Sequence, residues 1–197
     1  MICSIMNLKG GVGKTTTAMG LATAASRDGR QVRVVDADPQ ASASMWAYVA
    51  ESNGEALPFR VEPANRVLLQ TMRVADGEWA FVDCPPSGDV LDSAKRASDL
   101  VIVPLTPGLA DWQQALAITD ALMESRVPFR VLITLAEASR VMYREIVHAI
   151  EKLEMPVFRT EIPRREAVRT AFYHPFPEKL YGYGELWGEL KALEARG

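Results

Sequence analysis

Short apolar runs alternate along this chain with longer segments in which apolar residues recur at helical spacing. The run at 100–105 is apolar throughout, which is typical of a central strand buried on both faces of a sheet. Strands that alternate with helices in this way predict an α/β fold, in which helices cover both faces of a parallel sheet. The predicted strands are 2–6, 32–35, 79–82, 100–105 and 131–135, with weaker candidates at 59–61 and 157–159.

The segments between these runs predict helices, the first of which ends before Gly29. No internal repeat and no linker rich in serine or glycine divides the chain, so we expect residues 1–197 to fold as a single domain with a mostly parallel, twisted sheet. Because the first predicted strand begins at residue 2, we expect no separate DNA-reading domain before it. The predicted helices are 14–27, 43–50, 67–74, 90–97, 110–125, 140–153, 164–171 and 185–195.

The composition is that of a folded, water-soluble protein, since 48% of the 197 residues are hydrophobic and 24% are charged. The two cysteines, Cys3 and Cys84, lie in or beside apolar runs without a C-x-x-C spacing, which argues against a zinc ribbon, a redox dithiol or an iron–sulfur cluster. No apolar run approaches the roughly 18 to 20 residues of a membrane-spanning helix. The N-terminus has no signal-peptide pattern. We therefore expect a cytoplasmic protein that does not act on membranes.

The segment between the first predicted strand and the first predicted helix, residues 7–16, reads N-L-K-G-G-V-G-K-T-T. Glycines let such a loop curl so that its N–H groups converge on an anion, and the start of the following helix adds partial positive charge. Lys14 is then expected to reach the β- and γ-phosphates of a nucleotide, and the Thr15 hydroxyl to ligate Mg²⁺. The strict phosphate-loop pattern requires glycine where this chain has Leu8, so the motif is the deviant Walker A form of a P-loop NTPase. The nucleotide-binding residues expected in this loop are Gly10, Gly11, Val12, Gly13, Lys14, Thr15 and Thr16.

Three carboxylates, Asp36, Asp38 and Asp83, follow two of the predicted strands. Ligands of open α/β sheets bind at the edge where the carboxyl ends of the strands meet. Asp83 stands at the Walker B-like position and is expected to hold Mg²⁺ through water. Asp36 is assigned to the same metal site, either behind the direct ligands of the metal or as a residue that fixes the loop. Each of the three could instead serve only as a cap, as aspartates at strand ends often do.

Five motifs, in the same order along the chain, resemble those of the ParA/MinD family of deviant Walker ATPases. Besides K-G-G-V-G-K-T-T they are V-V-D-A-D-P-Q at 34–40, F-V-D-C-P-P-S at 81–87, S-D-L-V-I-V-P at 98–104 and F-R-T-E-I-P-R at 158–164. The resemblance covers most of the chain and points to the small, ParF-like ParA partition proteins, which lack an N-terminal DNA-binding domain. It implies that the protein binds ATP and ADP with Mg²⁺ and that ATP hydrolysis serves as a switch.

The resemblance also implies roles for individual residues. In the family, the lysine that matches Lys9 crosses the subunit interface to the phosphates of the partner, which implies a homodimer when ATP is bound. Lys9 and Lys14 are thus expected to act in catalysis together with Asp38, which orients or activates the attacking water. The family loop that packs on the adenine matches Ile162, Pro163 and Arg164.

The net charge of −3 argues against a protein that is basic overall, yet residues 126–169 carry 9 Lys and Arg against 6 Asp and Glu. A basic cluster in this stretch could contact DNA phosphates without reading bases. The resemblance implies the same, since ParA proteins bind nucleoid DNA non-specifically as ATP dimers. A solvated surface is an equal alternative, because Glu161 and Glu166 dilute the cluster, and Arg164 could serve the nucleotide instead. The candidate DNA-binding residues are Arg159, Arg165 and Arg169.

Together these features predict an ATPase that positions or segregates a plasmid or chromosome and whose hydrolysis is stimulated by a ParB-like adaptor protein. Two alternatives stay open at this point. The same ATPase could position a protein cargo, such as a microcompartment or a conjugation complex. A small-molecule ligase of the same fold is the other alternative. The last predicted helix carries more acid than base, which favours packing on the protein's own core over binding to a membrane.

Overall fold

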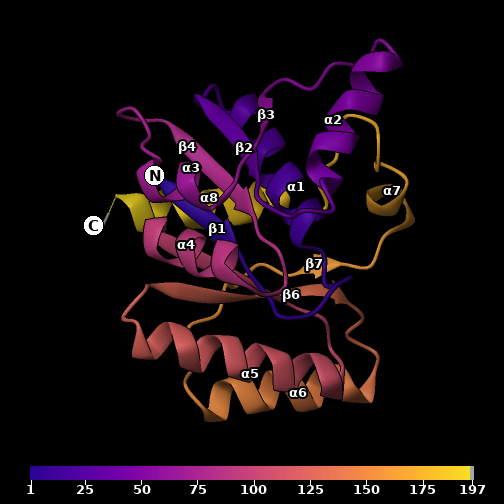
Figure 1. Ribbon diagram of the computed structural model, residues 1–197. Helices are drawn as coiled ribbons and strands as arrows, with labels where there is room; N and C mark the ends of the chain where they lie inside the picture. Colours follow the sequence, from indigo (N-terminus) through magenta and orange to yellow (C-terminus); the bar gives the residue numbers. More distant parts are fainter. Residues whose placement is uncertain (196–197) are drawn as a thin grey trace.

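The computed structural model describes residues 1–195 and is built around a seven-stranded sheet, shown in Figure 1. The strand order is β3-β2-β4-β1-β5-β6-β7, and every neighbouring pair is parallel. This confirms the predicted α/β fold with a parallel sheet. The strands are β1 (Ile2–Ile5), β2 (Val32–Asp36), β3 (Arg60–Pro63), β4 (Trp79–Asp83), β5 (Leu100–Leu105), β6 (Phe129–Ala136) and β7 (Ile162–Pro163).

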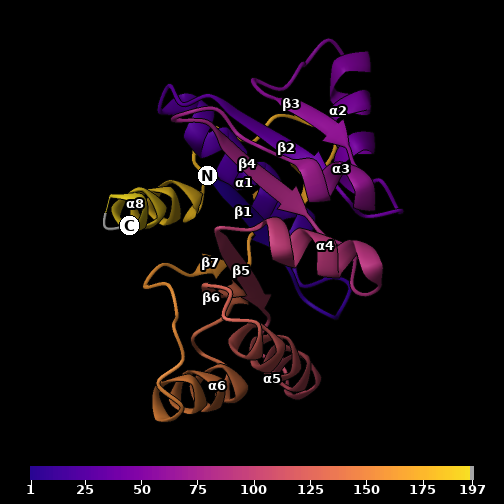
Figure 2. The same ribbon diagram turned by 60° about the vertical axis from the view of Figure 1, so that its left-hand side comes forward.

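Helices connect the strands and cover both faces of the sheet. They are α1 (Lys14–Arg27), α2 (Ser42–Ser52), α3 (Arg66–Thr71), α4 (Asp89–Ala97), α5 (Leu109–Glu124), α6 (Val141–Lys152), α7 (Glu166–Arg169) and α8 (Tyr183–Glu194). One apolar core lies between the sheet and α1, α2 and α8, and a second lies between the sheet and α3, α4, α5 and α6. Figure 2 shows α8 and α4 on opposite sides of the strands. Each helix within residues 1–195 is too short or too polar to cross a bilayer.

The last helix packs on the core, as its charge pattern predicts. Leu186 and Leu190 are fully buried there. The helix contacts α1 closely, because Gly20 of α1 leaves room for the ring of Tyr183. A Cβ on Gly20 would lie 2.5 Å from the Cδ2 atom of that ring, far inside van der Waals contact. The absence of a side chain at this position therefore sets the distance between the two helices.

The weak strand predicted at 157–159 is wrong in position. Val157 forms only an isolated bridge to Val131, and the edge strand of the sheet is β7 instead. The other weak candidate, at 59–61, is displaced by a smaller amount, since β3 begins at Arg60. In both cases pairing with a neighbouring strand, rather than local composition, decides which residues extend.

The helix predicted over 164–171 is reduced to the short α7. Arg164 still follows the edge of the sheet, since its N–H donates to the carbonyl of Ala136 at 3.3 Å. Arg165 is also extended, with φ of −135° and ψ of 133°. Contact with β6 thus overrides the helical propensity of the first residues of this segment.

Candidate functional site

The glycine-rich loop lies between β1 and α1, at the carboxyl end of a central strand. Gly11 and Gly13 adopt φ values of 79° and 91°, a left-handed conformation that is costly for residues with a side chain. Gly13 is also the N-cap of α1, and no side chain caps the first N–H groups of this helix. These N–H groups and the positive end of the helix dipole form an anion-binding site. The loop therefore has the conformation that phosphate binding requires.

Hydrogen bonds from the neighbouring strands hold this loop in place. The Asn7 side chain donates to the carbonyl of Pro104 in β5 at 2.7 Å and accepts the N–H of Lys9 at 2.9 Å. On the other side, the Thr134 hydroxyl of β6 donates to the carbonyl of Val12 at 2.9 Å. A loop that is ordered before the ligand arrives loses less conformational entropy on binding.

The two lysines of the loop have different surroundings. The Lys14 ammonium donates to the backbone carbonyl of Lys9 at 3.0 Å, and Lys14 is only 8% exposed. The Lys9 side chain is 42% exposed, and its ammonium forms an ion pair of 2.6 Å with Asp111 of α5. Lys14 is therefore positioned to serve phosphates bound by its own loop, whereas Lys9 is accessible from outside.

Asp36 fixes the segment that follows β2. Its two carboxylate oxygens accept the N–H groups of Asp38, at 3.3 Å, and of Ser44, at 2.7 Å. Asp38 is partly exposed and accepts the N–H of Gln40 at 2.9 Å. Of the two roles predicted for Asp36, behind the direct ligands of the metal or in fixing the loop, this arrangement favours the fixing of the loop.

Asp83, at the end of β4, is a buried carboxylate that a bound cation would stabilise. It lies in register with Asp36, and neither of its buried oxygens has a hydrogen-bond partner among the described residues. Burial raises the pKa of Asp83 to about 7, and the charge of Asp36 adds to the rise. The Thr15 hydroxyl, which approaches Asp83 without hydrogen-bond geometry, and the Lys14 ammonium act in the opposite direction.

These two residues, Asp83 and Thr15, fit the Mg²⁺ that a nucleotide brings. A buried carboxylate without donors is stabilised by a bound cation. No group of three or more His, Cys, Asp or Glu within residues 1–195 is arranged to hold a metal on its own. Water and phosphate oxygens would therefore have to supply the other oxygen ligands that this ion prefers.

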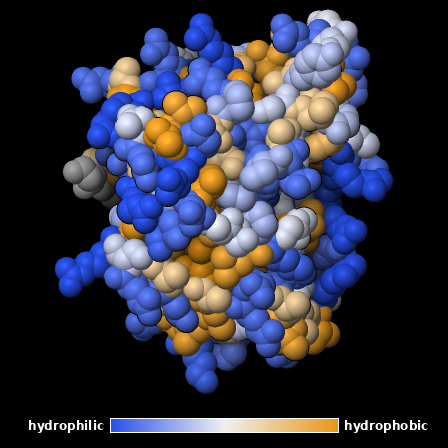
Figure 3. Space-filling view, viewed as in Figure 1, coloured by the Kyte–Doolittle hydropathy of each residue, from blue (hydrophilic) through white to orange (hydrophobic). Residues whose placement is uncertain are grey.

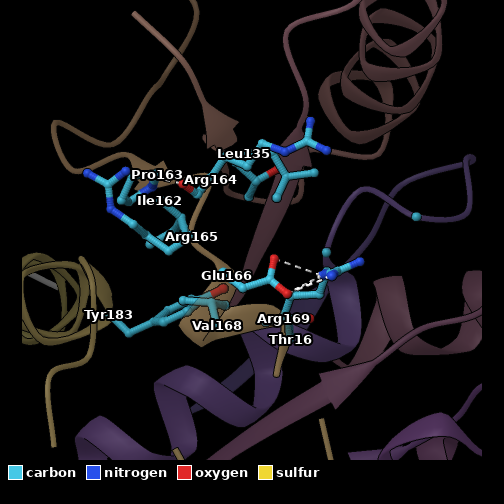
Figure 4. A pocket seen from close by; sticks show the side chains of 13 residues that line it. Thr16, Leu135, Ile162, Pro163, Arg164, Arg165, Glu166, Val168, Arg169 and Tyr183 are labelled. Atoms are coloured by element: carbon cyan, nitrogen blue, oxygen red, sulfur yellow. Dashed lines mark hydrogen bonds and ion pairs between the residues drawn. The ribbon is translucent and has the colours of Figure 1, made fainter. Parts of the chain in front are cut away.

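A cavity of about 480 Å³ opens between the glycine-rich loop and β7, and Figure 4 shows the side chains that line it. Ile162 and Pro163 supply apolar wall on the side of β7. Arg164 lines the same cavity and forms an ion pair of 3.3 Å with Glu137. An apolar wall opposite an anion site suits a nucleotide, whose base is flat and whose phosphates are charged. The phosphate loop and the three residues predicted for the adenine thus meet in one place.

Sequence reasoning missed five residues that line this cavity: Thr134 and Leu135 of β6, Glu166 and Val168 of α7, and Tyr183 of α8. Leu135 has a positive φ of 50°, a conformation that costs a non-glycine residue about 1–2 kcal/mol. It lies where the pairing of β6 with β7 shifts register, between Thr134 and Ala136. The sequence signal that could have found Thr134 and Leu135 is their position at the end of the strand predicted at 131–135. Ligands of open α/β sheets bind at the edge where the carboxyl ends of the strands lie.

The three arginines predicted to contact DNA do not share one site. Arg165 and Arg169 line the nucleotide cavity, and Arg169 pairs with Glu166 at 2.6 Å, as Figure 4 shows. This pair lowers the pKa of the Glu166 carboxyl. Arg159 lines a different cavity beside α8, where its N–H donates to Glu189 at 3.0 Å. A cluster of all three is therefore not present.

A curled loop at the start of α1, a buried carboxylate at the end of β4 and a cavity between the loop and β7 are the features of a P-loop nucleotide-binding protein. More narrowly, the chain belongs to the CobQ/CobB/MinD/ParA nucleotide-binding domain family, whose sequence profile matches residues 3–174. The resemblance to the ParA/MinD family is thereby confirmed.

Known proteins support this assignment. The chain is 37% identical over 200 residues to "Maintenance of carboxysome distribution protein A" of Gloeobacter kilaueensis, with 98% of this chain and 88% of the relative covered. A putative plasmid partition protein of Borrelia burgdorferi, solved with AMPPNP, is 18% identical with a TM-score of 0.77, and 99% and 98% of the two chains are covered. The septum site-determining protein MinD of Pyrococcus horikoshii, solved with Mg-ADP, is 18% identical with a TM-score of 0.79, and 98% and 96% are covered. The two solved structures bear on the fold alone.

Proposed function

We propose that this protein is a Mg²⁺-dependent ATPase that dimerises when ATP is bound and uses this switch to position a cargo. The observation that carries the proposal is the placement of two lysines on one loop, with Lys14 inside it and Lys9 on its outer side. One ammonium serves the phosphates of its own chain, and the other, on a side chain that is 42% exposed, serves those of a second copy. ATP is then part of the dimer contact, so hydrolysis releases the dimer.

The residues of the site divide the work of hydrolysis. Lys14 and the loop N–H groups bind the phosphates, and Lys9 of the second copy neutralises charge on the transferring phosphoryl group. Asp38 orients the attacking water. Thr15 and Asp83 would hold Mg²⁺, which would neutralise further phosphate charge.

We place the ATP-bound dimer on nucleoid DNA in the cytoplasm, bound without sequence preference. Arg165 and Arg169 support this, because they line the nucleotide cavity and can respond to its contents. The Arg169 side chain is 79% exposed despite its bond to Glu166. Arg159 would contribute only as a separate phosphate contact.

The cargo we propose is a plasmid or chromosome, held by a ParB-like adaptor that stimulates hydrolysis. A protein assembly is a second candidate cargo, and it is favoured by the relative that is 37% identical and named for carboxysome distribution. Deletion of the gene distinguishes the two. Loss of DNA from daughter cells supports partition, whereas clustering of a protein assembly with normal DNA inheritance supports the second candidate.

The switch is tested by sedimentation of the purified protein with Mg²⁺–ATP or Mg²⁺–ADP, with and without DNA. We expect monomers with ADP, dimers with ATP, and DNA binding only with ATP. Lys14→Ala is the control that removes nucleotide binding. A protein that stays monomeric in both nucleotides and consumes ATP only with a small carboxylic acid would be a ligase instead.

A further inference from the structure

The Lys9 ammonium is held within its own chain by a single carboxylate. Its Nζ atom lies 2.6 Å from Oδ1 of Asp111, which belongs to the first turn of α5. The Asp111 side chain is only 13% exposed, although Lys9 is 42% exposed. Breaking an ion pair with one buried partner leaves a charge poorly solvated, so this pair is harder to break than an ordinary surface pair.

The buried carboxylate of Asp111 is stabilised by its ion pair with Lys9. Apart from the ion pair, its Oδ1 atom is buried without a partner among residues 1–195. The start of α5 favours a negative charge in general, because of the helix dipole. That dipole does not replace a direct donor to the buried oxygen. When Lys9 leaves, Asp111 must turn toward water or find another donor.

The backbone before α5 leaves space for this carboxylate. Gly108 is the N-cap of α5, and a Cβ built on it would lie 2.6 Å from Oδ2 of Asp111. The φ of Gly108 is −152°, which any residue adopts, so the backbone does not require glycine at this position. A Cβ there would, however, push the Asp111 carboxylate out of its present position. The inward position of Asp111 therefore depends on the missing side chain of Gly108.

The backbone of Lys9 is fixed while its side chain can move. The N–H of Lys9 donates to Asn7, and its carbonyl accepts from Lys14. A lysine ammonium sits on a flexible four-carbon stem, so it can leave Asp111 without disturbing the phosphate loop. The same lysine can thus have two positions on one unchanged loop.

We propose that Asp111 is a latch that holds Lys9 within the monomer until the terminal phosphate of ATP on a second copy takes the ammonium away. The latch rests on the proposed function, in which Lys9 acts across the dimer. ADP lacks the terminal phosphate and does not release Lys9. The latch therefore suppresses dimers without ATP, and Asp111 acts as a positioning residue rather than as a catalytic one.

The test is the dimerisation of Asp111→Asn with AMPPNP and Mg²⁺, measured by sedimentation over a range of protein concentrations. We expect the concentration at half dimerisation to fall by about tenfold or more relative to wild type, which corresponds to ~1.4 kcal/mol. The affinity of the monomer for a fluorescent ATP analogue should stay unchanged. Asp120→Asn is the matched control, since it removes the same charge from an exposed position of α5 and should shift nothing.

A second variant, Gly108→Ala, keeps the charge of Asp111 but displaces its carboxylate. It should shift dimerisation in the same direction by a smaller factor, with folding of both variants checked by circular dichroism. If wild type dimerises and folded Asp111→Asn dimerises equally or more weakly, the latch is wrong and the proposed function stands. If wild type itself stays monomeric with AMPPNP, the proposed function fails, and the latch fails with it.

Discussion

Replacing Asp83 by asparagine is expected to stabilise the nucleotide-free protein at alkaline pH and to remove its stabilisation by Mg²⁺–ATP. Burial raises the pKa of this carboxyl from 3.8 to about 7. Because the folded state binds the proton more tightly than the unfolded state, the stability linked to Asp83 is complete below about pH 4 and is lost as the pH rises through about 7. Above that pH the ionised carboxylate costs the folded state roughly 4 kcal/mol.

The free-energy cost of the Asp83 carboxylate depends on pH, and this dependence separates the contribution of the carboxyl from other effects of the substitution. At about pH 5 the group is charged in the unfolded chain but mostly protonated in the folded one, so the cost is only about 1.5 kcal/mol. The asparagine variant has no such titration. Its free energy of unfolding, relative to wild type, should therefore rise by roughly 2–3 kcal/mol between about pH 5 and about pH 8. Because the same variant is compared with wild type at two pH values, any effect of the amide on stability that does not depend on pH cancels.

The assay is urea denaturation at both pH values, followed by circular dichroism, with EDTA and without nucleotide. Asp120→Asn serves as the control, because it removes an exposed carboxylate and should show no comparable dependence on pH. A stability difference between Asp83→Asn and wild type that stays constant or falls as the pH rises would refute the reasoning. Melting with Mg²⁺–ATP then tests the metal site, since only wild type should gain stability.

Three further changes test other parts of the structure. Lys14→Ala should abolish ATP binding in a calorimetric titration, because its ammonium faces its own loop, and retained binding would contradict the assignment of that loop. Arg165→Ala should weaken DNA binding and lower its salt dependence by about one phosphate contact, whereas an unaltered salt slope would place the DNA surface elsewhere. Gly20→Ala should destabilise the protein by about 1–3 kcal/mol, because the new Cβ would overlap the Tyr183 ring, and a melting temperature equal to that of wild type would argue against this tight packing.

Elements with strong local signals match their predicted bounds. The strand at 100–105 and the helix at 14–27 are both observed as predicted, because an unbroken apolar run and a helical repeat closed by glycine are properties of the segment itself. The segment at 157–165 is different, since its shape is set by β6, to which Val157 and Arg164 are hydrogen-bonded or bridged. Pairing of this kind is not visible in the segment alone.

In the candidate site, too, some residues are recognisable from the local sequence, and others are brought to the site only by the fold. The phosphate loop is contiguous and Asp83 follows an apolar run, so both are recognisable from the sequence. Leu135 and Tyr183 reach the cavity only because the fold brings β6 and α8 to it. Asp111 is the clearest case, because nothing in the sequence around it indicates an ion pair with a lysine of the phosphate loop.

Action of Lys9 across the dimer is tested most directly by mixing two inactive variants and measuring ATP hydrolysis. The Lys9→Ala chain keeps Asp38 but lacks the ammonium that acts on the second copy. The Asp38→Ala chain keeps this ammonium but lacks the Asp38 carboxylate. In a mixed dimer, one site combines Asp38 of one chain with Lys9 of the other. Half of the dimers in an equal mixture are mixed and each has one working site, so we predict about a quarter of the wild-type activity. A mixture no more active than the average of the two variants alone would contradict the action of Lys9 across the dimer.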